Sequence, residues 1–138
     1  NLSIVLRYFS FSFIMCGLDN MFEAYQDKKS IYYVIKKDDK ILGGCGIKKL
    51  DGSDKNICEL QKFYFHQSLR GKGVGKFVLD LCLKFAKEVG YELCYLESTS
   101  VLKISHYLYK VFEFENLDGP LGDTSHYSCD VHMIKKLK

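Results

Sequence analysis

The stretch Arg70-Gly71-Lys72-Gly73-Val74-Gly75-Lys76 decides which fold this sequence predicts. Residues 58–65 before it are mainly apolar and aromatic, as expected of a strand. Residues 74–89 predict a helix, because apolar residues recur at helical spacing and Gly90 follows as a C-terminal cap. Residues 91–96 predict the next strand, and this order indicates a parallel strand pair with a right-handed crossover. The predicted buried stripe of the helix is Val74, Phe77, Val78, Leu81, Cys82, Phe85 and Val89.

Upstream of this unit, the sequence predicts a β-hairpin. Residues 31–36 and 41–47 are strand-like and flank the polar turn at residues 37–40. The second of these strands contains Gly43, Gly44 and Gly46, which are poor strand residues. They indicate a bulge, or the close approach of another backbone or a ligand.

The remaining segments complete a mixed α/β fold. Residues 102–112 predict a second helix and residues 127–134 a last strand. Near the start, residues 19–27 predict a helix, whereas residues 2–16 fit a strand and a helix equally well. The expected fold class is α/β, with a mixed, mostly antiparallel sheet that contains a central parallel strand pair and is flanked by helices.

Composition and charge exclude several classes of protein. The chain has 138 residues, which predicts one domain over residues 1–138. Hydrophobic residues make up 47% and charged residues 27%, a balance that excludes disorder. A net charge of only +3 argues against a nucleic-acid partner. Residues 2–16 are too short to span a bilayer, so we expect no membrane partner. The first residue is Asn rather than Met, which we interpret as truncation or processing of the N-terminus.

Six cysteines are scattered along the chain without a C-x-x-C pair: Cys16, Cys45, Cys58, Cys82, Cys94 and Cys129. We interpret them as reduced, mostly buried thiols of a cytoplasmic protein. His126, Cys129 and His132 have a loose metal-ligand spacing, but no fourth ligand is evident and strand alternation would separate them. We therefore predict no metal, and a zinc-bound regulatory domain is the weakest alternative.

The glycine loop, residues 70–76, predicts a binding site for a pyrophosphate. Its alternating glycines let the backbone turn tightly and expose consecutive N–H groups beside a helix N-terminus. Lys62, Arg70, Lys72 and Lys76 lie between Glu59 and Asp80 with no acidic residue among them. The loop matches neither the P-loop nor the G-x-G-x-x-G dinucleotide fingerprint. Taken alone, it would more often be a structural turn with solvated lysines.

In this context the loop resembles the acetyl-coenzyme A loop of the GNAT superfamily of N-acetyltransferases. Arg70, Gly73 and Gly75 match the family pattern Arg/Gln-x-x-Gly-x-Gly/Ala. The segment Tyr109-Lys110-Val111-Phe112-Glu113-Phe114 is similar to the family's Tyr-x-x-Leu/Phe-Gly-Phe, and the resemblance covers most of residues 20–138. It implies a GNAT-like fold and transfer of an acetyl group from acetyl-CoA to a primary amine by direct attack in a ternary complex. The implied acceptor is an amine-bearing small molecule, or the lysine or N-terminus of a protein.

The resemblance also implies two catalytic residues. Tyr109 is the expected general acid that protonates the leaving thiolate, with Tyr107 as an alternative on another helix face. Glu59 is the expected general base, acting directly or through a water. The structural alternatives are a Tyr109 ring that packs in the core and a Glu59 that pairs with Lys62 or faces solvent.

Cofactor binding is expected from a strand and from the glycine loop. The backbone of Phe63, Tyr64 and Phe65 is expected beside the pantetheine arm, where one N–H can hold the thioester oxygen. The expected loop contacts are Arg70, Gly71, Lys72, Gly73, Val74, Gly75 and Lys76. His126 and His132 are expected to line the acceptor site, and His106 to lie on the surface of the second helix.

Three positions depart from the family pattern. Gln67 stands where Pro is common, Glu113 where Gly usually ends the second helix, and residues 98–100 lack the Asn that often contacts the cofactor. These departures leave a non-catalytic acyl-CoA-binding sensor or interaction module as the alternative function. The last strand is a candidate surface for a homodimer.

Overall fold

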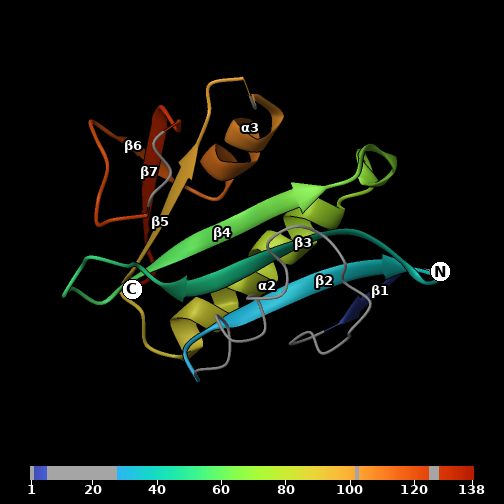
Figure 1. The fold of residues 1–138 in the computed structure, drawn as a ribbon, viewed down its shortest axis with the longest axis horizontal. Helices are drawn as coiled ribbons and strands as arrows, with labels where there is room; N and C mark the ends of the chain where they lie inside the picture. Colours follow the sequence, from blue (N-terminus) through green and yellow to red (C-terminus); the bar gives the residue numbers. More distant parts are fainter. Residues whose placement is uncertain (1, 6–27, 102, 125–127) are drawn as a thin grey trace.

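The computed structural model describes residues 2–5, 28–101, 103–124 and 128–138. Seven strands form one sheet in the order β1-β2-β3-β4-β5-β7-β6 (Figure 1). The strands are β1 (Leu2–Val5), β2 (Ile31–Lys37), β3 (Lys40–Lys49), β4 (Ile57–Phe65), β5 (Leu93–Ser98), β6 (Glu115–Leu117) and β7 (Val131–Lys136). Every neighbouring pair is antiparallel except β4 and β5, which are parallel. The predicted fold class is therefore confirmed.

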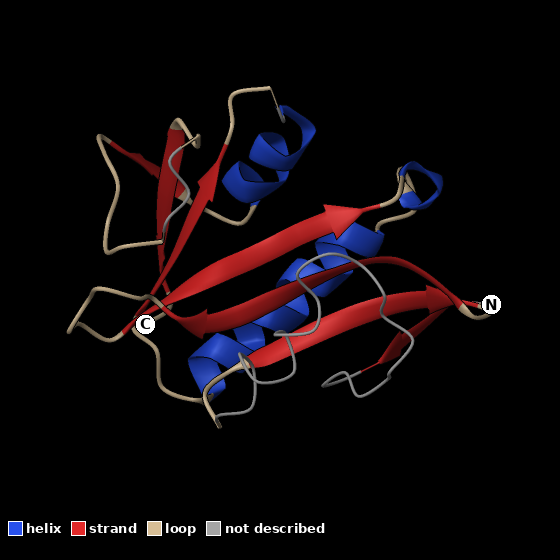
Figure 2. Ribbon diagram, in the orientation of Figure 1, coloured by secondary structure: helices blue, strands red, loops and turns tan. Residues whose placement is uncertain are grey.

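Two α-helices and one 3-10 turn accompany the sheet: η1 (Gln67–Leu69), α2 (Val74–Glu88) and α3 (Lys103–Val111). Helix α2 crosses one face of the sheet and connects the two parallel strands (Figure 2). Its buried residues are Val78, Leu79, Cys82, Leu83 and Ala86. The predicted buried stripe is therefore wrong in part. Phe77 is 55% exposed, whereas Leu79 and Leu83, which the prediction left out, face the core. The cause is that apolar residues cover more than half of the helix circumference, so periodicity alone cannot choose the buried side.

Both helices end in the same hydrogen-bonded turn. The Tyr91 N–H donates to the Ala86 carbonyl at the end of α2, and the Phe114 N–H donates to the Tyr109 carbonyl at the end of α3, each at 3.0 Å. In this turn the residue after the cap adopts a left-handed conformation, which favours glycine. That residue is Gly90 after α2, with φ +97°, but Glu113 after α3, with φ +68°. The substitution of Glu for Gly thus leaves the turn unchanged.

Several predicted boundaries needed correction. The last strand was predicted at residues 127–134, but β7 spans Val131–Lys136 and residues 128–130 lie outside it. The short strand β6 was missed because three residues carry too little alternation to detect. Within residues 2–16, the described part, Leu2–Val5, is a strand. The rest of that segment and the predicted helix at residues 19–27 lie outside the described residues.

The cysteines agree with the predicted reduced state wherever the structure describes them. Cys45, Cys58, Cys82 and Cys94 are free and buried, and Cys129 is free and half-buried. No helix in the described ranges has both the length and the apolar character needed to cross a membrane.

Candidate functional site

Strands β4 and β5 diverge and form a fork. They pair through three residues each, Ile57 with Leu93, Cys58 with Cys94 and Glu59 with Tyr95. Beyond this point β4 continues alongside β3, whereas β5 continues alongside β7 (Figure 1). Residues 60–65 of β4 therefore bond to a neighbouring strand on one side and present an open backbone edge on the other. Such an edge can bind an extended ligand as an additional strand.

A β-bulge lies in the open part of β4. Gly44 pairs with Tyr64 and Gly46 pairs with Gln61, so Lys62 and Phe63 together stand opposite a single residue of β3. Lys62 has φ +54°, a left-handed conformation that is uncommon for a residue other than glycine. One extra residue reverses the alternation of side chains beyond it.

The bulge decides which β4 side chains face the helices. Before the bulge, Cys58 and Leu60 belong to the core under α2, whereas after it Phe63 and Phe65 pack against that core. Lys62 and Tyr64 are exposed, and Tyr64 retains 63% of its accessible surface. The open edge is thus lined by two phenyl rings on the helix side.

The glycine loop leads from the end of β4 into α2. Gly71 and Gly73 both have φ +75°, and a Cβ placed on either would have no atom within 4 Å. Glycine is thus required there by backbone conformation, and the space above both residues is open. Gly73 is also the N-cap of α2, so no side chain occupies the first-turn N–H groups.

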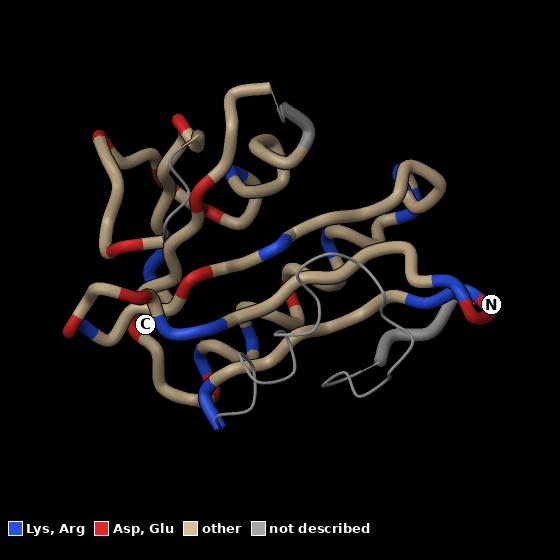
Figure 3. Tube along the Cα trace, viewed as in Figure 1, with Lys and Arg blue, Asp and Glu red and all other residues tan. Residues whose placement is uncertain are grey.

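The basic side chains of the loop are available to an anion. Arg70, Lys72 and Lys76 are exposed, and none of the acidic residues in the described ranges pairs with them. Figure 3 shows basic residues of this loop at the same end of the sheet as the β2–β3 turn, which carries both lysines and aspartates. Open glycines, free helix N–H groups and basic side chains fit a diphosphate.

The loop, the fork and α3 meet at Tyr109. A Cβ on Gly75 would lie 3.6 Å from a Phe63 ring carbon and 3.7 Å from Leu108 of α3. The Tyr109 ring packs edge-on against Phe63, with centroids 5.6 Å apart, and is 4% exposed. Burial raises the pKa of Tyr109, while a hydrogen bond with Ser105 opposes that rise, so the phenol is protonated at neutral pH.

The structure separates the two tyrosines considered for the acid. Tyr107 is 73% exposed on the outer side of α3, whereas Tyr109 reaches the fork. The Tyr109 ring also packs against Phe114, so its structural and catalytic interpretations are compatible.

Glu59 lies on the opposite face of the sheet. It pairs across the fork with Tyr95, whose side chain belongs to the small cluster away from α2. Glu59 is 2% exposed and accepts a hydrogen bond of 2.7 Å from the Gln61 amide. The structural alternative in which Glu59 faces solvent is therefore wrong. Candidate acid and candidate base approach the fork from different faces.

A polar network that the sequence did not predict lies beside Glu59. The Tyr95 hydroxyl donates to Glu97 at 2.6 Å, lies 3.1 Å from His132 Nδ1 and accepts the Leu121 N–H at 3.1 Å. Thr124 donates to the other Glu97 oxygen. The network fixes the loop before β7 onto the sheet. In the sequence, the alternation along the strand predicts only that Tyr95 and Glu97 share one face. It does not predict that β7 lies beside them.

The two described residues of the alternative metal set, Cys129 and His132, lie in surroundings that do not favour metal binding. His132 is engaged by Glu97 and Tyr95, and His126 lies outside the described residues. Burial raises the pKa of Cys129, and the negative charges of Glu97, Asp130 and Glu59 raise it further, which disfavours the thiolate that a metal needs. Across the described ranges, no three His, Cys, Asp or Glu side chains could hold a metal ion.

The serines that replace the family's Asn have partners of their own. The Ser98 hydroxyl lies 3.0 Å from His106 Nε2, and the Ser100 N–H donates to Asp130 at 2.8 Å. The prediction that His106 is a surface residue was thus wrong, since it is half-buried and holds the end of β5.

A separate hollow of about 360 Å³ lies at the other end of the sheet, lined in part by Lys29, Lys49, Lys55 and Tyr91. It lies at the start of β4, whereas the glycine loop follows the end of β4, so it is not the expected cofactor cleft.

The chain matches known acetyltransferases in sequence and in structure. The sequence model of the acetyltransferase (GNAT) family matches residues 2–114. An uncharacterized N-acetyltransferase of Escherichia coli K12, YjgM, is 40% identical over 121 residues, which cover 88% of this chain and 72% of that protein. A GNAT-family acetyltransferase from Staphylococcus aureus Mu50 superposes with a TM-score of 0.78 at 22% identity, over 88% of this chain and 76% of that one.

A second solved structure contains coenzyme A. It is the PaiA N-acetyltransferase from Thermoplasma acidophilum, with a TM-score of 0.61 at 21% identity, over 78% of this chain and 60% of that one. At such identities the two structures are evidence of a shared fold.

Proposed function

This chain belongs to the GNAT family of acetyltransferases, and we propose that it transfers an acetyl group from acetyl-CoA to a primary amine by direct attack in a ternary complex. The observation that carries the proposal is the meeting of the fork, the glycine loop and Tyr109 at one place. The buried free thiols further support a reducing compartment such as the cytoplasm.

The cofactor would be held by backbone groups and by charge. The open edge of β4 at Phe63, Tyr64 and Phe65 would bind the pantetheine arm, as an added strand does. The loop contacts would be Arg70, Gly71, Lys72, Gly73, Val74, Gly75 and Lys76, which combine first-turn N–H groups with three cationic side chains. When bound, acetyl-CoA supplies an acetyl group activated as a thioester, whose C–S bond breaks as the C–N bond to the acceptor forms.

Glu59 would accept the proton that the amine must lose. With a pKa near 10.4, only roughly one lysine-like amine in 2,500 is unprotonated at pH 7. Glu59 is buried and accepts a hydrogen bond from Gln61, an uncharged donor. Its face of the sheet, opposite to that of Tyr109, suits an acceptor that approaches from the side away from α2.

Tyr109 would hold the proton that the sulfur receives. Burial keeps its phenol protonated, and its ring is held between Phe63 and Phe114. A donor placed in this way stabilises a thiolate as it leaves and then returns a proton to it.

The proposal is tested by thiol release from acetyl-CoA across a panel of amines, with and without substitutions. Tyr109→Phe should lower kcat by about 100-fold, the lower range for loss of a general acid, while calorimetric binding of acetyl-CoA is retained. The matched control Tyr107→Phe removes an exposed hydroxyl from the same helix and should keep full activity. Full activity of Tyr109→Phe would contradict the acid assignment.

Glu59→Gln preserves the acceptor atom for Gln61 and should slow transfer at pH 7. The defect should shrink as pH rises, because more amine is then unprotonated. Tight acetyl-CoA binding without transfer to any amine in the panel would contradict the proposed activity and favour a binding module.

A further inference from the structure

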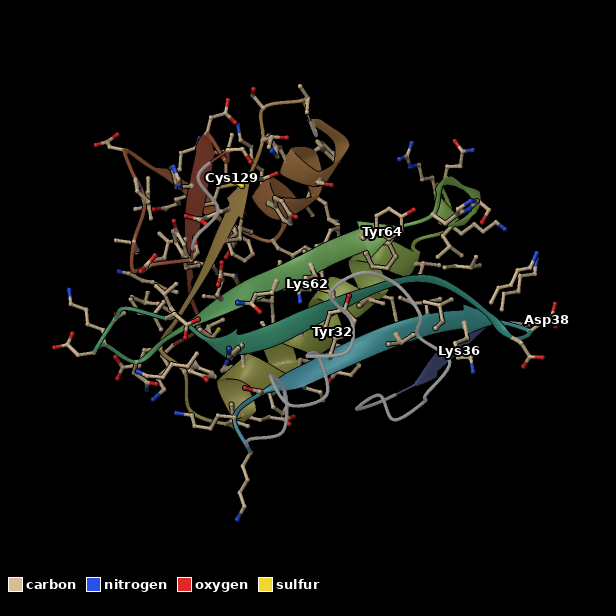
Figure 4. The ribbon with its side chains drawn as sticks, viewed as in Figure 1. Tyr32, Lys36, Asp38, Lys62, Tyr64 and Cys129 are labelled. Atoms are coloured by element: carbon tan, nitrogen blue, oxygen red, sulfur yellow. The ribbon has the colours of Figure 1, made fainter. Side chains whose placement is uncertain are left out.

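A tyrosine on β2 reaches across β3 to the bulge on β4. The Tyr32 hydroxyl donates to the Lys62 carbonyl at 3.2 Å, although β3 lies between the two strands. Figure 4 shows Tyr32, Lys62 and Tyr64 on the same face of the sheet, with α2 behind it.

Glycines on β3 make this bond possible. A Cβ on Gly44 would lie 2.7 Å from the Tyr32 ring and 2.9 Å from its hydroxyl oxygen, so only glycine lets the ring cross here. At the next position, a Cβ on Gly43 would lie 2.4 Å from the Tyr64 carbonyl oxygen. Gly44 therefore leaves room for the Tyr32 ring, and Gly43 leaves room for the close approach of β4.

The carbonyl that Tyr32 binds belongs to the peptide unit between Lys62 and Phe63, within the bulge at the open edge of β4. The Lys62 carbonyl and the Phe63 N–H share one planar trans peptide, so they point in opposite directions. A carbonyl held by Tyr32 turns the Phe63 N–H away from Tyr32. Because Lys62 has φ +54° without being glycine, this orientation needs support from its surroundings.

We propose that Tyr32 is a positioning residue for acyl transfer, because its hydrogen bond to the Lys62 carbonyl sets the direction of the Phe63 N–H at the open edge of β4. The inference rests on the proposed function, in which an N–H of this segment holds the thioester oxygen. Burial raises the pKa of Tyr32, so its hydroxyl remains a donor throughout the neutral range.

The test compares two tyrosine-to-phenylalanine variants. Tyr32→Phe removes the bond to Lys62, and Tyr91→Phe removes a similar bond, 3.1 Å from a buried tyrosine hydroxyl to the Lys29 carbonyl, at the far end of the sheet. Complete loss of an oxyanion donor lowers kcat by about 100- to 1,000-fold, so loosening one should lower it by about tenfold. Tyr32→Phe should show this loss with acetyl-CoA affinity within about twofold of wild type, while Tyr91→Phe keeps its kcat.

A readout independent of activity uses the protein without cofactor. In ¹⁵N-labelled protein, Tyr32→Phe should shift the Phe63 amide resonance and speed its hydrogen exchange, whereas Tyr91→Phe should leave both unchanged. A wild-type kcat in Tyr32→Phe, or equal losses in the two variants, would overturn the positioning role. If no amine accepts an acetyl group from the wild type, the proposed function fails, and an unchanged Phe63 amide in Tyr32→Phe would separately overturn the inference.

Discussion

Replacing Glu113 by glycine should stabilise the fold, because Glu113 occupies the left-handed position that ends α3. Its φ is +68°, and the turn carries both hydrogen bonds that define this type of helix end, from Glu113 to Lys110 at 2.9 Å and from Phe114 to Tyr109 at 3.0 Å. The Cβ is thus strained by backbone conformation, not by crowding in an irregular turn.

The size of the effect follows from two opposing contributions. A left-handed conformation costs a residue with a Cβ roughly 1–2 kcal/mol. Glycine also makes the unfolded chain more flexible, and this entropy offsets about 0.4–1 kcal/mol of the gain in stability. Glu113 also lies 3.9 Å from Lys135 but is 87% exposed, so this ion pair contributes little. The expected net gain is about 0.5–1 kcal/mol, or about 2–4 °C in Tm for a chain of this size.

Thermal and denaturant unfolding of three variants would measure it. Glu113→Ala loses the ion pair but keeps the Cβ. Glu113→Gly should therefore be more stable than Glu113→Ala by the net backbone effect of removing the Cβ. Gly90→Ala is the reverse change at the end of α2, where a new Cβ meets no atom within 4 Å, and it should cost a similar amount. Equal stability of Glu113→Gly and Glu113→Ala would refute this reasoning.

Two further predictions concern the glycine loop and the buried thiols. Gly73→Ala should lower stability by about 1 kcal/mol and weaken calorimetric binding of acetyl-CoA, because φ is +75° there, whereas Gly75→Ala, at a helical position, should raise the unfolding temperature. Burial raises the pKa of Cys45, and a hydrogen bond with Cys58 together with burial raises that of Cys94. Since unfolded thiols titrate near pH 8.5, stability should be complete below that pH and fall above it by about 1.4 kcal/mol per pH unit for each thiol. A denaturant-derived stability that stays constant from pH 8 to 10 would contradict this.

The glycine loop was recognisable from sequence because its signals are local. The loop places glycines at alternate positions and three cationic residues within seven consecutive residues, and a helix follows. Gly71 and Gly73 are needed for their positive φ, and this requirement holds whatever packs around them. The basic side chains are exposed, so their charge acts without a specific neighbour in the chain.

Which β4 side chains line the fork was not predictable from sequence. Nothing in Lys62 marks it as a bulge residue, yet its left-handed backbone decides that Phe63 and Phe65 face the helices. The same holds for the side of α2 that is buried, where Phe77 was expected inside and lies outside. In both cases several registers satisfy the apolar pattern, and the packing of distant elements selects one.

The sequence by itself determined the order of β2, β3, β4, α2, β5, α3 and β7, the parallel pair around α2 and the glycine loop, because each depends on residues within a few positions of one another. Only the tertiary structure decided that Glu59 and Tyr109 approach the fork from opposite faces and that Glu97 meets His132. It alone also revealed that Tyr32 bonds to Lys62 across an intervening strand, 30 residues away along the chain. These contacts depend on strand register and on one bulge, and register is settled by the burial of whole faces rather than by any single residue.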